Sequence, residues 1–229
     1  MKCGELSPVY KKDDKLQENN YRPVSVLTSL SKLYESILND QLYEYACGIF
    51  DDLLSAFRKG YSCQSILLKF LEDWKLALDK HKVVGALFID LSKAFDCLPH
   101  GLLIAKLQAY GLTMDSCTLI SSYLSDRMQR VKISNTRSSW SILTKGVPQG
   151  SILGPLLFNI FINDMFMFIE KCDLYNYADD NSLSNAADDV ATVTANLQYD
   201  AMVSIRWFKV NGMETNPVKF QFMIGSNQA

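Results

Sequence analysis

The sequence predicts an α+β fold. Apolar residues recur at helical spacing in Ser29–Ala46 and in Ser62–Leu78, which predicts two amphipathic helices. A continuous apolar run, Val83–Ile89, is typical of a strand that is buried on both faces. Two further strand-like segments, Arg130–Ile133 and Trp140–Leu143, flank a polar turn and therefore predict a hairpin.

The remaining segments fit the same class. Residues 1–23 are polar and end in Asn-Asn-Tyr-Arg-Pro, so we expect an extended entry loop there. No internal repeat and no Gly/Ser linker interrupts the chain, so any boundary lies between lobes of one unit. The other expected elements are helices over His100–Tyr110 and Asp115–Ser125, a long helix from Pro155, a strand over Leu174–Ala178, a helix over Val190–Lys209 and a strand over Phe220–Ile224.

Composition and charge exclude several classes of protein. The 229 residues are 48% hydrophobic and 21% charged, with 11 Gly and 6 Pro, which excludes wholesale disorder, collagen and low-complexity scaffolds. The net charge of −2 does not mark the whole chain as a nucleic-acid binder. Residues 126–145 are nevertheless basic, whereas residues 173–200 hold six Asp and no Lys or Arg. This separation suits a metal site that handles a polyanion, and two solvated faces explain it equally well.

The cysteines and the most apolar stretch bear on compartment and membrane. Six cysteines without a C-x-x-C spacing, beside only two histidines, predict no structural zinc site. No signal peptide opens the chain, so we expect reduced thiols and an intracellular protein of the nucleus or cytoplasm, not a secreted one. The stretch Ile152–Ile169 contains Pro155, Asn159, Asn163 and Asp164, which favours a core helix and no membrane partner.

Carboxylates at two places are candidates for chemistry. Asp179–Asp180 follows the strand-like segment Leu174–Ala178, although a solvated turn also explains such a pair. Asp90 ends the buried strand, or alternatively caps a helix that starts near Ser92. Three aspartates brought together at strand ends offer the hard oxygen ligands that Mg²⁺ prefers, and two such ions suit in-line phosphoryl displacement. Polymerases and nucleases both use that chemistry.

Three segments resemble, in order and spacing, the palm motifs of reverse transcriptases of non-LTR (LINE-type) retrotransposons. They are FIDLSKAFD at 88–96, GVPQGSILGPLLF at 146–158 and YADD at 177–180. Supporting matches are NYRPVS at 20–25, AFRKG at 56–60, and Trp207 through Asn216 to Lys219. The resemblance covers nearly the whole chain. It implies a right-hand polymerase palm, in which an antiparallel sheet packs on helices, with a mostly helical fingers lobe.

The same resemblance implies lobes, partners and cofactors. We expect a fingers lobe over residues 1–82, the first part of the palm over 83–111, a fingers/palm hairpin insertion over 112–146 and the second part of the palm over 147–229. The thumb and the endonuclease domain are expected to be missing, so another part of a longer polyprotein or another chain would supply them. The implied partners are an RNA template with a DNA primer, and dNTPs. The implied cofactor is a pair of Mg²⁺ ions, for which Mn²⁺ can substitute.

The resemblance gives roles to a catalytic set of residues. Asp90, Asp179 and Asp180 match the metal-binding catalytic acids of the family. Lys219 matches a lysine that protonates the departing pyrophosphate or pairs with its charge. A snorkelling surface lysine is the alternative for Lys219.

The resemblance also implies a nucleotide-binding set. Arg22 matches an arginine that contacts the triphosphate, for which a guanidinium is well suited. Phe95 matches a steric gate that clashes with a ribose 2′-hydroxyl, and ordinary core packing is the alternative. Gln149 matches a residue that lines the incoming-nucleotide site, and Gly150 allows close backbone approach.

Template contacts are expected from basic residues. Arg58 and Lys59 either contact template phosphates or solvate a loop. Arg127 and Arg130 belong to the basic hairpin region, which suits a sequence-independent, salt-sensitive template track.

Three functions therefore remain open at the level of sequence. The first is an RNA-directed DNA polymerase, a nucleotidyltransferase that joins dNTPs to a primer 3′-hydroxyl on an RNA template. The second is a catalytically inactive or truncated retrotransposon remnant that retains the palm fold and binds RNA. The third is another two-metal enzyme, an RNA-dependent RNA polymerase or a nuclease. The bulky Phe95 argues against ribonucleotide use.

Overall fold

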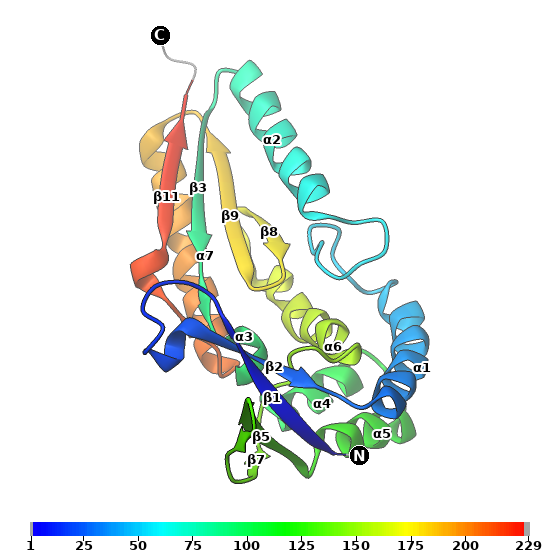
Figure 1. Ribbon diagram of the computed structural model, residues 1–229. Helices are drawn as coiled ribbons and strands as arrows, with labels where there is room; N and C mark the ends of the chain where they lie inside the picture. The colour runs from blue at the N-terminus through cyan, green and yellow to red at the C-terminus, as the bar shows by residue number, and fades with distance from the viewer. Residues whose placement is uncertain (1, 227–229) are drawn as a thin grey trace. The chain divides into compact units, whose positions relative to one another are not determined.

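The fold was analysed in a computed structural model that describes residues 2–226, apart from the Asn19 side chain. The chain divides into two compact units, residues 1–49 with 95–158, and residues 50–94 with 159–229. We call them unit 1 and unit 2 and describe each by itself. Both units combine helices with antiparallel strand pairs (Figure 1), which confirms the predicted α+β class. The fingers and palm boundaries expected from the resemblance stay a prediction.

The sheet of unit 1 joins the N-terminus of the chain to the basic hairpin. Strand β1 pairs antiparallel with β2 and parallel with β5, so that Glu5 lies opposite Arg130. Strand β5 also pairs antiparallel with β6 and β7. The bounds are β1 Cys3–Tyr10, β2 Tyr21–Val26, β5 Arg127–Ile133, β6 Thr136–Arg137 and β7 Ser141–Leu143.

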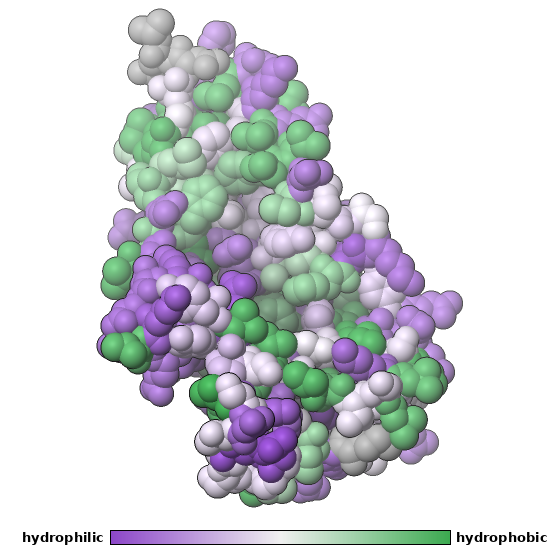
Figure 2. All heavy atoms as spheres, viewed as in Figure 1, coloured by the Kyte–Doolittle hydropathy of each residue, from purple (hydrophilic) through white to green (hydrophobic). Residues whose placement is uncertain are grey.

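The extended loop expected over residues 1–23 is wrong, because Cys3–Tyr10 form β1 and β2 already begins at Tyr21. Leu6 is buried, and β1 has a hydrogen-bonded partner on each side. The polar residues that suggested a loop lie in the exposed β1–β2 connection, Lys11–Gln17. Hydrophilic side chains gather over this connection and over the β5–β7 hairpin (Figure 2). Since the parallel partner β5 lies far along the chain, no local pattern reveals the pairing.

The helices of unit 1 are held by caps and by one buried carboxylate. The predicted helix Ser29–Ala46 is confirmed as α1, and the Thr28 hydroxyl caps it by accepting from the Ser31 N–H. Glu35 of α1 is fully buried and accepts from the Tyr123 hydroxyl at 3.0 Å and from the Ile152 N–H at 2.7 Å. Burial, reinforced by Glu35, raises the pKa of Tyr123. The other helices here are α3 Ala94–Cys97, α4 His100–Ala109, α5 Met114–Leu124 and α6 Leu153–Ile162; α3 and α6 also contribute residues to unit 2.

Unit 2 is built on a four-stranded antiparallel sheet in the order β11-β3-β9-β8. The apolar strand β3 is central, as its sequence predicts. Gly85 faces α7, since a Cβ atom there would lie 2.5 Å from Val193 Cγ1, whereas Ala86 packs in a cluster with Phe70 of α2. Helices α2 and α7 therefore cover opposite faces of the sheet, because successive residues of a strand point to opposite sides. The bounds are β3 Val83–Ile89, β8 Asp173–Tyr177, β9 Asp180–Ala187, β11 Gln221–Gly225, α2 Cys63–Asp79 and α7 Val190–Val210.

Two predictions from the sequence, a long helix from Pro155 and a helix cap at Asp90, are wrong. The expected long helix from Pro155 is shorter, because α6 ends at Ile162 and a 3₁₀ segment, Asn163–Phe168, follows. Asp90 does not cap a helix, since the chain continues as β4 (Leu91–Ser92), which pairs with β10 (Glu214–Thr215). Within residues 2–226, no helix has both the length and the apolar character needed to cross a bilayer.

Asp200 anchors the turn that leads into β8. Its carboxylate is fully buried on α7 and accepts from three successive backbone N–H groups, those of Glu170 at 3.2 Å, Lys171 at 2.8 Å and Cys172 at 2.7 Å. Three donors on one carboxylate compensate for much of the cost of burying its charge. Asp200 thus connects α7 to the start of the β8–β9 hairpin, whose turn carries Asp179.

The substitution Asp200→Asn should lower the free energy of unfolding by about 2–3 kcal/mol, because an amide cannot accept from all three N–H groups. Urea denaturation followed by circular dichroism measures this change. Asp188→Asn, at an exposed aspartate beside the N-terminus of α7, is the matched control and should leave the midpoint nearly unchanged. Equal midpoints for the two variants would contradict the anchoring role.

Candidate functional site

Three carboxylates meet at one end of the unit 2 sheet. In the β3–β9 pairing Ile89 lies opposite Asn181, so Asp90 follows at the same end as Asp180. The β8–β9 hairpin closes with Tyr177 opposite Asp180, which places Asp179 in the turn. Asp179 and Asp180 are exposed and Asp90 is half-buried. The structure thus brings together the three acids that the sequence singled out.

Two buried asparagines brace the turn that carries Asp179. Asn176 donates from Nδ2 to the Ala178 carbonyl and to Asn181 Oδ1, both at 2.9 Å. Asn181 in turn donates to the Asp179 carbonyl at 3.0 Å. Ala178 adopts a left-handed conformation with φ of +57°, which a non-glycine residue rarely does without such support. The sequence analysis missed both asparagines, although their position on either side of YADD was a usable signal.

Electrostatic repulsion and one lysine balance each other at this end of the sheet. Burial, followed by the charges of Asp179 and Asp90, raises the pKa of Asp180, and Lys219 opposes the shift. The Lys219 ammonium lies 3.0 Å from Asp90 Oδ2 and 3.3 Å from Oδ1. Lys219 is delivered there by the backbone, because the Asn216 N–H donates to the Asp90 carbonyl at 2.9 Å. The predicted catalytic lysine therefore contacts a predicted catalytic acid.

The ligand type at this end of the sheet is the one that a divalent cation prefers. Mg²⁺ and Mn²⁺ prefer carboxylate oxygens, and three carboxylates that repel one another gain most from a shared positive charge. Among residues 2–226, no group of three or more His, Cys, Asp or Glu side chains is placed so that it could hold a metal ion. Lys219 is the cation that offsets Asp90 in this arrangement.

The predicted nucleotide-binding residues belong to unit 1, where a strap, residues 146–150, connects them. The Ser25 N–H on β2 donates to the Gln149 carbonyl at 2.7 Å, and the exposed Arg22 lies on the same strand. Gly150 has φ of +98°, and a Cβ atom there would lie 3.0 Å from the Ser25 carbonyl oxygen, so glycine is required. On its other side the strap bonds to Phe95, whose carbonyl accepts from the backbone N–H of Val147 at 2.9 Å.

Phe95 itself has a packing partner. Its ring stacks on that of Phe158, with centroids 4.4 Å apart and planes 23° apart. The side chain is nonetheless half-buried, so part of it faces solvent. Both the packing role and the gate role predicted for Phe95 are compatible with this placement, and the gate role stays a prediction.

Two residues that the sequence analysis did not single out contact the strap. The Gln149 amide nitrogen Nε2 lies 3.1 Å and 3.2 Å from the two carboxylate oxygens of Asp96. The His100 Nε2 atom lies 2.7 Å from the Gly146 carbonyl oxygen. Asp96 ends the motif at 88–96, and His100 follows it four residues later.

The basic residues predicted to bind template differ in their surroundings. Arg58 of unit 2 donates from Nη1 to the carbonyls of Asp51 and Leu54 and lies over the Tyr61 ring, so part of its guanidinium is used within its own loop. Lys59 beside it is exposed. In unit 1, Arg127 is buried and its guanidinium donates to the Tyr123 carbonyl. Template contacts of these residues stay predictions.

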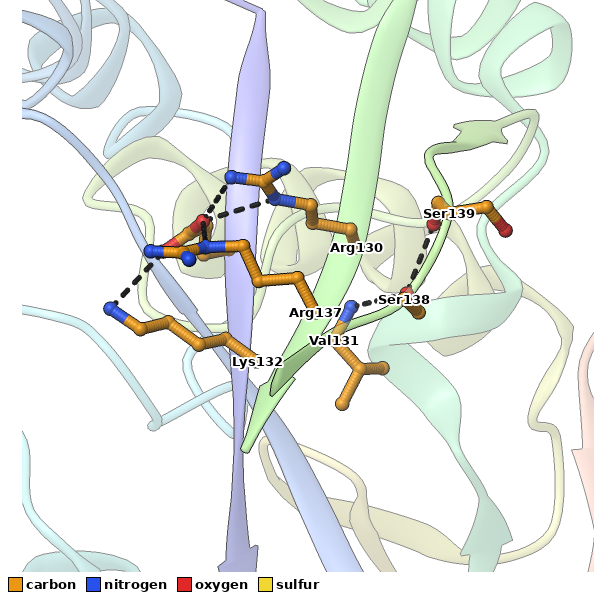
Figure 3. Close-up of polar contacts among 7 residues, drawn as sticks. Arg130, Val131, Lys132, Arg137, Ser138 and Ser139 are labelled. Carbon is orange, nitrogen blue, oxygen red and sulfur yellow. Dashed lines mark hydrogen bonds and ion pairs between the residues drawn. The ribbon is translucent and has the colours of Figure 1, made fainter. Parts of the chain in front are cut away.

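Arg130 belongs to an ion cluster centred on Glu5. Arg130 donates to Glu5 Oε1 at 3.0 Å and 2.5 Å, and Arg137 donates to the same oxygen at 2.9 Å, while Lys132 lies 3.6 Å from Oε2. Figure 3 shows the three basic side chains pointing toward one carboxylate. The hydrogen bonds from Arg130 and Arg137 lower the pKa of Glu5 to about 2. Arg130 also lies over the Trp140 ring, 4.4 Å from its centroid.

Comparisons with known proteins identify the family of the chain. Residues 9–229 match the family model described as reverse transcriptase (RNA-dependent DNA polymerase). The probable RNA-directed DNA polymerase from transposon BS of Drosophila melanogaster is 32% identical over 215 residues, covering 87% of this chain and 23% of that protein. A Pol polyprotein from the type-1 retrotransposable element R2 of Popillia japonica is 26% identical, covering 91% of this chain and 30% of that protein. The chain thus spans under a third of these relatives' length.

A solved structure shares the fold. Apo telomerase from Candida tropicalis, truncated from its C-terminal domain, superposes with a TM-score of 0.69 at 14% identity, covering 100% of this chain and 51% of that one. At this identity the likeness concerns the fold alone.

Removing one charge from the carboxylate end of the sheet should stabilise the protein when no divalent cation is present. Asp180→Asn is expected to raise the thermal midpoint in EDTA at pH 7, because it relieves the repulsion from Asp179 and Asp90. Added Mg²⁺ should raise the midpoint of the parent more than that of the variant. Differential scanning calorimetry with and without Mg²⁺ measures both effects. A lower midpoint for the variant in EDTA would show that repulsion is not the dominant interaction.

Proposed function

The chain belongs to the reverse transcriptase family, and on that premise we propose that it acts as an RNA-directed DNA polymerase. The reaction joins a dNTP to the 3′-hydroxyl of a DNA primer on an RNA template. The single observation that carries the proposal is the meeting of Asp90, Asp179 and Asp180 at one end of an antiparallel sheet. A phosphoryl transfer enzyme needs such an anionic cluster to bind cations beside the substrate phosphates.

We propose that these three aspartates hold two Mg²⁺ ions, or Mn²⁺ in their place. When bound, the ions supply Lewis-acid stabilisation for the attacking and leaving oxygens. Lys219 pairs with Asp90 through its ammonium group, and a cation on Asp90 would compete with that pairing. Lys219 then carries a proton within the same cluster, where it protonates the leaving pyrophosphate or offsets its charge.

The nucleotide-binding roles rest on the strap and on β2. Arg22 is exposed and carries a guanidinium suited to a triphosphate. Gln149 and Gly150 occupy a backbone segment fixed by Ser25, so their geometry is set before a nucleotide arrives. Phe95 selects dNTPs by excluding a 2′-hydroxyl.

Three further proposals, on template binding, lobe boundaries and cellular location, rest on the family resemblance. We propose that Arg58, Lys59, Arg127 and Arg130 contribute to template binding, that the fingers and palm lobes have the boundaries given above, and that the protein works inside the cell. The relatives are longer proteins. We propose that further sequence, of a longer polyprotein or of another chain, supplies thumb and endonuclease functions. A remnant that only binds RNA is the alternative that the next experiment separates from a polymerase.

Asp179→Asn should reduce primer extension by more than about 100-fold, because it removes a carboxylate proposed to bind a metal ion directly. The assay is incorporation of dTTP on poly(rA)·oligo(dT) with Mg²⁺. The variant should keep the circular dichroism spectrum of the parent, since Asp179 is exposed in a turn. Extension by the variant at the parental rate would remove Asp179 from the mechanism, and a folded parent without extension would favour the RNA-binding remnant.

Phe95→Ala should raise the use of rNTP relative to dNTP by about tenfold or more, because the smaller side chain admits the 2′-hydroxyl. Steady-state incorporation of UTP against dTTP gives the ratio. Phe158→Ala is the matched control, since it removes the other ring of the stacked pair. An equal change of the ratio in both variants would mean that Phe95 acts only through packing.

A further inference from the structure

The strap, residues 146–150, is fixed to the segment that follows the first palm motif. The Gly146 N–H donates to the Leu98 carbonyl at 2.7 Å, and the Val147 N–H donates to the Phe95 carbonyl at 2.9 Å. Gly146 has φ of +81°, and a Cβ atom there would lie 2.7 Å from the Asp96 Cα atom. The two backbones are therefore in direct contact, and side chains of one can set the geometry of the other.

His100 latches the first residue of the strap. Its Nε2 atom lies 2.7 Å from the Gly146 carbonyl oxygen. A carbonyl oxygen can only accept, so the hydrogen bond requires the proton on Nε2. Neutral histidine in that tautomer and protonated histidine both satisfy this requirement. His100 is itself fixed as the first residue of α4.

Asp96 sets the orientation of the Gln149 amide. Both Asp96 carboxylate oxygens face Gln149 Nε2, at 3.1 Å and 3.2 Å. An ionised carboxylate only accepts, so it selects the rotamer in which the amide NH₂ group points toward Asp96 and the amide oxygen points away. Without Asp96, the two orientations of the Gln149 amide would differ much less in energy. Both residues are half-buried, so water competes only partly for this contact.

We propose that Asp96 and His100 are positioning residues for the nucleotide-binding strap. Asp96 fixes which atom of the Gln149 amide a nucleotide meets, and His100 fixes the backbone at the opposite end of the strap. The inference rests on the proposed function, because the nucleotide contact of Gln149 is part of that proposal. Neither residue touches the nucleotide in this account, so each acts through the strap.

A double-mutant cycle on dTTP incorporation tests the role of Asp96. Asp96→Asn should raise the KM for dTTP about tenfold with little change in kcat, since it removes a charge-assisted hydrogen bond that orients a binding group. In a Gln149→Ala background the same substitution should have no further effect on kcat/KM. Equal effects in both backgrounds would overturn the proposal, because Asp96 would then act independently of Gln149. Asp40→Asn, at an exposed aspartate of α1, is the matched control.

A rescue series tests the role of His100. His100→Gln keeps a side-chain N–H donor and should preserve most of the dTTP affinity, whereas His100→Ala should raise the KM several-fold. Parental KM in His100→Ala, or an equal rise in KM in His100→Gln and His100→Ala, would overturn this part.

Equilibrium binding separates failure of the inference from failure of the proposed polymerase activity. A fluorescent N-methylanthraniloyl derivative of dATP, titrated with Mg²⁺ present, reports binding without turnover. A parent that extends no primer but binds the derivative about tenfold more tightly than Asp96→Asn would refute the activity and support the positioning role. Equal binding by parent and Asp96→Asn, or no binding by the parent, would overturn the inference.

Discussion

The antiparallel register of β3 against β9 sets the position of every carboxylate in the candidate site. Because Ile89 pairs with Asn181, Asp90 emerges at the end of the sheet where the β8–β9 turn carries Asp179 and Asp180. Burial, followed by the like charges of Asp179 and Asp90, raises the pKa of Asp180. The hydrogen-bonded ladder of four strands maintains the arrangement, and Lys219 offsets part of the repulsion. A shift of one residue in this register would send the side chains to the opposite face.

Buried polar side chains fasten the functional segments of both units to their scaffolds. In unit 2, Asp200 holds the chain before β8, and Asn176 braces the turn after it. In unit 1, Glu35 accepts from the Ile152 N–H and so holds the chain just after the strap. Each of these groups bonds to backbone, which fixes main-chain geometry independently of neighbouring side chains. The turn that carries Asp179 and the chain just after the strap are thus each held by a buried polar side chain.

Local patterns were sufficient for the elements whose signal is periodic. The bounds of α1 and the apolar strand β3 follow from the sequence, since helical spacing and a continuous apolar run are local properties. Strand β9 was harder to predict from the sequence, because its Asn-Ser-Leu-Ser-Asn stretch has the composition of a loop. It forms a strand because it pairs with a neighbouring strand on each side. The strand pairing at the N-terminus depends on β5, and no local rule connects segments so far apart.

The candidate site divides in the same way. The three aspartates were predictable because motif spacing and resemblance both mark them, whereas Asp96 and Asn176 act through contacts that only the folded chain reveals.

The most direct test of the central claim is Mn²⁺ binding to the intact chain, followed by electron paramagnetic resonance. If Asp90, Asp179 and Asp180 form one cation site, the parent binds Mn²⁺ saturably, and Asp90→Asn and Asp180→Asn each weaken that binding markedly. Mn²⁺ binding that is unchanged in both variants would contradict the account, because the carboxylates that the sheet brings together would then not act as a common site.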